Sequence, residues 1–92
     1  MKVLRDQIEK IDEALLGLLV ERMKLAKQIG DYKKTAQIQV EDPLREAELL
    51  ARYSQAPDLS PEFVEKIFKE IFEESRKIQG WPQLKQIVFE KK

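Results

Sequence analysis

A single apolar seam runs through the first third of the sequence and predicts that this segment is helical. Its members, whose steps alternate between four and three residues, are Leu4, Ile8, Ile11, Leu15, Leu18, Arg22, Leu25, Ile29 and Tyr32. This spacing is typical of a heptad seam along one face of a helix. Before Lys34 only Gly17 weakens the pattern, at a cost of about 1 kcal/mol relative to alanine, and a glycine there can mark a close helix contact.

The length of this helix bears on assembly. Roughly 32 residues at about 1.5 Å each form a rod of about 48 Å. A compact domain of 92 residues is only about 30 Å across. The apolar seam of a monomer would therefore project into water. Because a second copy is the simplest cover, we predict an intertwined helical homodimer.

A second, shorter helix is predicted from position 43 to about Tyr53. Residues 35–41 lose the heptad pattern and are predicted to form a loop. Asp42 then supplies an N-cap carboxylate, and Pro43 occupies the first helical position. The inner side of this helix is expected to carry Leu49 and Leu50.

A third helix is predicted to start at Ser60-Pro61-Glu62, which repeats the same start signal after a short connection over 55–59. It is expected to end near Gln79, with Gly80 as the stop. Its predicted buried residues are Phe63, Val64, Ile67, Ile71 and Phe72. The pattern leaves open whether 83–92 form a short helix or a loose tail. We thus expect an all-α chain of three helices, one long and two shorter, forming a single domain over 1–92.

Composition excludes several kinds of chemistry. The chain has no cysteine and no histidine, which removes disulfides, thiol nucleophiles, histidine bases and the usual zinc sites. With 17 basic and 17 acidic residues the net charge is +0, which argues against nucleic acid or a membrane surface as a partner. The longest apolar run, over 14–20, is too short to span a membrane. Since the first residues do not resemble a secretory signal, a cytoplasmic protein is expected.

Arg22 occupies a seam position where leucine is expected. A buried guanidinium needs an anion, because an isolated charge away from water costs several kcal/mol. Lys33 follows eleven residues later, about 20° around the helix and about 16 Å along it. The two side chains therefore face the same way and could converge on a small ligand. Equally, Arg22 could pair with a core carboxylate such as Asp12, Glu46 or Glu73.

Polar residues recur at helical spacing on the other two predicted helices. The second helix carries Asp42, Arg45 and Glu46 on one face. Asp42 is also explained as an N-cap alone, and the other two as surface charges. The third helix carries Ser75 and Gln79 one turn apart, a pair that a polar helix end would also explain.

Taken together, these residues resemble the all-helical chorismate mutase family over about residues 2–79. The residues that carry the resemblance, in the family's order and at closely similar spacing, are Arg5, Glu21-Arg22, Lys33, Asp42-x-x-Arg45-Glu46 and Ser75-x-x-x-Gln79. The segment from Gly80 onward, with Trp81 and Pro82, departs from the family pattern. We therefore treat 80–92 as a C-terminal tail.

The resemblance implies conversion of chorismate to prephenate, a Claisen rearrangement in phenylalanine and tyrosine biosynthesis. Such a unimolecular step needs no base, nucleophile, metal or cofactor, which agrees with a chain lacking histidine and cysteine. The catalyst must instead hold a flexible dianion in a reactive geometry and stabilise charge on the ether oxygen.

The resemblance also implies roles for individual residues. The substrate's carboxylates would be fixed by Arg22, Lys33, Arg45 and Ser75. Lys33 and Gln79 would donate hydrogen bonds to the ether oxygen. Glu46, near Asp42 at the helix start, would accept the ring hydroxyl. Arg5 would enter the site of the partner subunit.

Two other functions compete with this one. The first is a lyase on the same fold that eliminates pyruvate from isochorismate. Relatives of that kind tend to lack the acidic and serine positions seen here as Asp42, Glu46 and Ser75. The second is a non-catalytic dimerisation or regulatory module that binds an aromatic-pathway metabolite.

Overall fold

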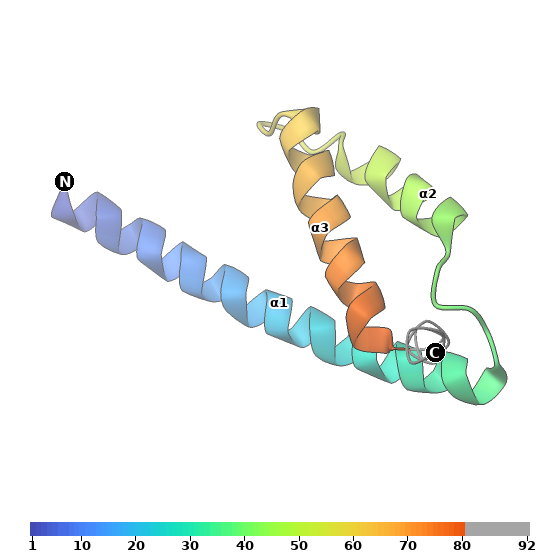
Figure 1. Cartoon of the computed structure of the whole chain (residues 1–92). Helices are drawn as coiled ribbons and strands as arrows, with labels where there is room; N and C mark the ends of the chain where they lie inside the picture. Colours follow the sequence, from blue (N-terminus) through green and yellow to red (C-terminus); the bar gives the residue numbers. More distant parts are fainter. Residues whose placement is uncertain (81–92) are drawn as a thin grey trace, which may run out of the picture.

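The computed structural model describes residues 1–80, which form three helices and no strand. These are α1 (Lys2–Ala36), α2 (Pro43–Tyr53) and α3 (Pro61–Gln79), as Figure 1 shows. The predicted all-α class is thus confirmed, and the predictions for 81–92 lie outside the described residues. None of the three helices contains a stretch that is apolar and long enough to cross a membrane.

The first helix is longer at its C-terminal end than predicted. The segment 35–41 was expected to be a loop, but Thr35 and Ala36 still belong to α1, which has 35 residues. The Thr35 hydroxyl donates to the carbonyl of Asp31 at 3.1 Å, so its polar group is satisfied inside the helix. The helix ends at Gln37, which adopts a left-handed conformation (φ 58°) and returns its N–H to α1. The end of the apolar pattern therefore did not mark the end of the helix.

Local capping interactions fix the other boundaries. The Asp42 carboxylate accepts the backbone N–H of Arg45, and the Ser60 hydroxyl accepts that of Phe63. At the end of α3, Gly80 has a φ of 77°, a conformation that favours glycine. These boundaries agree with the sequence prediction.

The helices α1 and α2 both pack against α3. Only the C-terminal half of α1 meets α3, and its N-terminal half extends away from the rest of the chain (Figure 1). Accordingly, every residue from 1 to 18 is exposed. The small core, made of residues from α1, α3 and the segment before α2, consists of Ala26, Val40, Val64 and Phe72.

The apolar seam of α1 does not face this core. Its apolar members remain between 48% and 68% exposed along the whole helix. Towards α3 the helix presents a different face, on which Ala26 and Gly30 are buried. A complete apolar face therefore stays open in the single chain, in agreement with the predicted homodimer, which remains a prediction.

The predicted core of α3 is only partly correct within one chain. Val64 and Phe72 are buried and Ile71 is half-buried, but Phe63 is 51% and Ile67 38% exposed. Phe63 and Ile67 are four residues apart and so share a face, one that neither α1 nor α2 covers. On the opposite flank, the rings of Tyr53, Phe68 and Phe72 contact one another in series and join α2 to α3.

Candidate functional site

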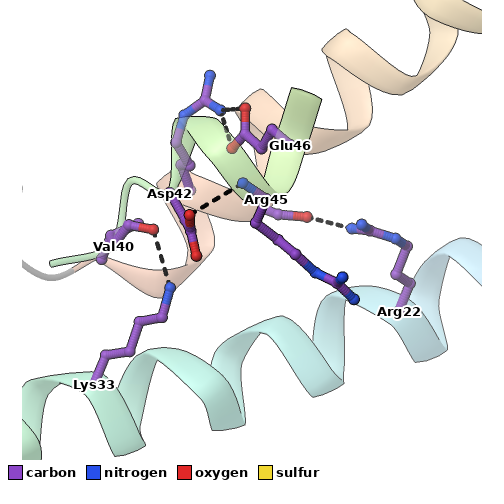
Figure 2. Close-up of polar contacts among 8 residues, drawn as sticks. Arg22, Lys33, Val40, Asp42, Arg45 and Glu46 are labelled. Carbon is purple, nitrogen blue, oxygen red and sulfur yellow. Dashed lines mark hydrogen bonds and ion pairs between the residues drawn. The ribbon is translucent and has the colours of Figure 1, made fainter. Parts of the chain in front are cut away.

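A pocket of about 340 Å³ lies between the three helices. Its lining contains seven of the eight predicted site residues: Arg22, Lys33, Asp42, Arg45, Glu46, Ser75 and Gln79. One further charged residue, Arg76, completes the polar part, and the apolar walls are Ile29, Val40, Leu49, Tyr53 and Phe72. Figure 2 shows the charged side chains of α1 and α2 facing one another across this space.

Arg22 is held by a neutral partner. Its Nη1 donates to the hydroxyl of Ser75 at 2.5 Å, and its guanidinium lies 5.6 Å from the ring centroid of Phe72. The carboxylate pairing considered from the sequence is not found, since Arg22 has no ion pair within residues 1–80. A hydroxyl orients a guanidinium without neutralising it, so the charge of Arg22 remains available to an anion.

Lys33 is placed in a similar way. Its Nζ donates to the backbone carbonyl of Val40 at 3.1 Å, across the segment that joins α1 to α2 (Figure 2). The backbone of the same segment is tied to α1, because the N–H of Ile38 donates to the carbonyl of Lys33 at 2.8 Å. A second cation is thus fixed on the pocket wall by a neutral acceptor.

Asp42 and Arg45 mark the start of α2 at the pocket. The N-cap interpretation of Asp42 is confirmed by its bond from the backbone N–H of Arg45, at 3.1 Å. The side chain of Arg45 extends towards α1 (Figure 2) and lies 3.8 Å from Glu48, with both side chains more than half exposed. Such a solvent-screened pair contributes little, so Arg45 is free to turn to a ligand.

Arg76, which also lines the pocket, is not among the residues predicted from the sequence. This residue of α3 contacts both carboxylate oxygens of Glu46 on α2, at 2.6 and 2.5 Å. Its position three residues before Gln79 places it on the same helix face as Gln79, and that spacing is the signal that could have identified it.

Gln79 lies where α3 crosses α1. Its Oε1 is buried and has no hydrogen-bond partner among the described residues. At the crossing, the backbone of Gln79 occupies the space that a side chain at position 30 would need, so only glycine fits there. The close contact expected at Gly17 is absent from the described chain, because nothing lies within 4 Å of a β-carbon placed there. Gly30, four residues after buried Ala26, marks the contact instead.

The charges of the pocket favour a small dianion. Four cations and two carboxylates line it, and four minus two leaves a net charge of +2. Among residues 1–80, Arg22 and Lys33 are held by neutral groups, so these two charges are already oriented before any ligand arrives. In residues 1–80 no group of histidine, cysteine or acidic side chains is arranged to hold a metal ion.

Arg5 is the one predicted site residue that the chain does not bring to the pocket. It lies seventeen residues before Arg22 on α1, about 25 Å away. A second cavity, of about 240 Å³, adjoins the pocket at Arg22, Ser75 and Gln79. Two exposed seam residues, Leu25 and Ile29, also line it. The seam face of α1 therefore borders the site.

Comparisons with known proteins give matches over most of this chain. A family model described as chorismate mutase type II matches residues 4–80. The T-protein of Enterobacter agglomerans is 33% identical over 78 residues, which are 82% of this chain and 21% of that protein. The bifunctional chorismate mutase/prephenate dehydratase of Escherichia coli (strain K12) is 37% identical over 75 residues, 78% of this chain and 19% of that protein. This chain thus spans about a fifth of the length of these relatives.

A solved structure is also similar over nearly its whole length. The chorismate mutase (form II) from Thermus thermophilus superimposes with a TM-score of 0.83 at 31% sequence identity. The match covers 88% of this chain and 94% of that one.

Proposed function

This chain belongs to the chorismate mutase type II family, and we propose that it converts chorismate to prephenate in phenylalanine and tyrosine biosynthesis. The observation that carries the proposal is the pocket between the three helices. It gathers seven residues predicted from sequence and has a net charge of +2, which complements the two carboxylates of the substrate. No other described cavity combines cations from all three helices.

The first requirement of the reaction is to hold the substrate. Chorismate rearranges by breaking one C–O bond as one C–C bond forms, with no proton transferred. Arg22, oriented by Ser75, and Arg45 would grip its carboxylates through forked guanidinium contacts. Holding a flexible dianion in the reactive chair removes much of the entropic part of the barrier.

The second requirement is to stabilise the charge that develops on the ether oxygen. Lys33 would donate to it from α1, exchanging its bond to the Val40 carbonyl for the ligand. Gln79 would donate from α3, at the position where the helix crossing fixes its backbone. Donors aimed at this oxygen act more strongly in the transition state than in the ground state, and only such differential binding accelerates the step. Glu46 would accept the ring hydroxyl.

The site would be completed by a second copy of the chain. The seam of α1 is open along its whole length, and its residues Leu25 and Ile29 line the cavity that adjoins Arg22 and Gln79. A partner's α1 packed on this seam in the opposite direction would bring the partner's Arg5 to that cavity. The proposed enzyme is therefore a homodimer with two shared sites.

A direct assay tests the activity. The purified chain is incubated with chorismate and, separately, with isochorismate in the presence of a strong chelator, and prephenate and pyruvate are followed. We expect prephenate from chorismate, and none from an Arg22→Ala variant purified in the same way. Release of pyruvate from isochorismate alone would indicate the lyase, and binding without turnover would indicate a non-catalytic module. A requirement for a divalent ion would contradict the proposed mechanism.

A further inference from the structure

Arg76 differs from the other pocket cations because its partner is a carboxylate of the pocket itself. Arg22 is bound to a hydroxyl and Lys33 to a backbone carbonyl, so neither charge is compensated by the residues that the structure describes. Arg76 is the pocket cation that directly contacts a carboxylate lining the same pocket, that of Glu46. Its charge is therefore already matched before a substrate binds.

The pair is partly withdrawn from water and joins two helices. The side chains of Arg76 and Glu46 are 26% and 28% exposed, far less than those of the surface ion pairs of this chain. One guanidinium nitrogen contacts both carboxylate oxygens, which restricts the orientation of the carboxylate. Charge-assisted bonds of this kind are about twice as strong as neutral ones, so the carboxylate has a defined position on the pocket wall.

We propose that Arg76 is a positioning residue, which fixes the carboxylate of Glu46 as the acceptor for the substrate's ring hydroxyl and does not itself bind the substrate's carboxylates. This inference rests on the proposed function. It assigns the pocket cations to two tasks. Arg22, Lys33 and Arg45 face the dianion, and Arg76 serves Glu46.

The consequence of losing Arg76 follows from the remaining charges. Glu46 would keep its negative charge without its partner, and Arg45 is its neighbour in sequence. A released carboxylate would compete with the substrate for Arg45 and the other cations, and the net charge of the pocket would fall from +2 to +1 (three cations minus two carboxylates). The competition acts through Glu46, so it should largely disappear when Glu46 carries no charge, and without both charges the pocket returns to +2 (three cations minus one carboxylate).

A double-mutant cycle tests this dependence. Glu46→Gln, Arg76→Met and the double variant are compared with the wild type for kcat and KM on chorismate. Lys77→Met serves as the matched control, because Lys77 is a neighbouring exposed cation in the same last turn of α3. Each site variant is expected to lose about tenfold to a hundredfold in kcat/KM. The double variant should remain within about twofold of Glu46→Gln alone, and the control close to wild type.

Two further measurements separate positioning from folding and from direct anion binding. Arg76→Lys, which keeps a cation beside Glu46, should recover most of the activity that Arg76→Met loses. The second measurement is the affinity for a dicarboxylate analogue of chorismate that lacks the ring hydroxyl, determined by calorimetry. In the Glu46→Gln background, where no released carboxylate can compete for the cations, the additional Arg76→Met change should weaken this affinity by no more than about threefold.

The possible failures can be told apart. If the two single losses multiply in the double variant, or if Arg76→Met clearly weakens binding of the hydroxyl-free analogue in the Glu46→Gln background, Arg76 is an anion ligand and the inference is wrong. If the wild type does not turn over chorismate, the proposed function fails and the inference fails with it. An active wild type with independent losses overturns the inference alone.

Discussion

A β-carbon placed on Gly30 of α1 would lie 2.6 Å from the Cα of Gln79 on α3 and 2.7 Å from its carbonyl oxygen. Both are backbone atoms, which cannot move aside as the end of a flexible side chain can. The missing side chain at position 30 thus sets how closely α3 approaches α1. Because Gln79 lines the pocket, this helix crossing also sets the position of the proposed ether-oxygen donor.

The first prediction concerns this crossing. Gly30→Ala should force the last turn of α3 away from α1 and displace Gln79, so that kcat falls more than KM rises. Overpacking of this kind costs about 1–3 kcal/mol, so thermal unfolding should also occur at a lower temperature. Steady-state kinetics and a thermal melt measure the two effects.

Gly17→Ala is the matched control for that substitution. Nothing in the described chain lies within 4 Å of a β-carbon there, and alanine is favoured over glycine inside a helix by about 0.5–1 kcal/mol. We expect this variant to keep its activity and to unfold at an equal or higher temperature. Similar kinetics for the two variants would contradict the role given to Gly30.

The second prediction uses the neutrality of Gln79. Its amide does not titrate, whereas a glutamate at this position could donate to the ether oxygen only when protonated, and its reference pKa is about 4.3 before any burial raises it. Gln79→Glu should therefore lower kcat/KM at neutral pH and recover activity as the solution is acidified. A pH–rate profile with the wild type as reference measures this. Equal impairment from about pH 5 to 8 would argue against a direct bond to the ether oxygen.

The third prediction concerns Lys33. Lys33→Met keeps an unbranched side chain of nearly the same length but removes the charge and the donor. Loss of one preorganised donor to developing charge costs about 3–4 kcal/mol, a rate reduction of about a hundredfold to a thousandfold. Lys34→Met is the control, because Lys34 is the exposed neighbouring lysine. If both variants lose activity equally, general electrostatic attraction rather than a specific donor at position 33 explains the effect.

The fourth prediction tests whether the site is shared between two chains. Arg5 and Arg22 lie about 25 Å apart along one helix, farther than a small dicarboxylate can bridge, so both can serve one site only if they come from different copies. Arg5→Ala and Arg22→Ala, each inactive alone, are unfolded together and refolded. About half of the dimers should then be mixed, and each mixed dimer has one intact site, so about a quarter of wild-type activity should return.

The two parent variants, refolded separately, are the controls for this mixing experiment. If Arg5 acted within its own chain, every site in the mixture would carry a lesion. Activity no higher than the average of the two parents would therefore rule out the shared site.

Apart from the last turn of α1, the helices and most members of the site could be predicted from the sequence. The starts of α2 and α3 follow from Asp42 and Ser60, whose side chains accept backbone N–H groups three residues later, and the end of α3 follows from Gly80. Such interactions span only a few residues, so they can be predicted from local sequence. The heptad spacing likewise predicted an apolar face on α1, and the family resemblance carried by the order and spacing of the polar residues indicated seven that line one pocket.

Which of these groups meet depends on the tertiary structure. Periodicity defines a face of a helix but not what that face contacts, and the face of α1 that packs on α3 carries Ala26 and Gly30 rather than the seam. The partner of Arg22 proved to be a hydroxyl 53 residues away, and Glu46 pairs with Arg76 across 30 residues. These contacts form where α3 packs against α1 and α2. The space at such a contact depends on the side chains of both helices, so the residue spacing within one helix cannot predict it.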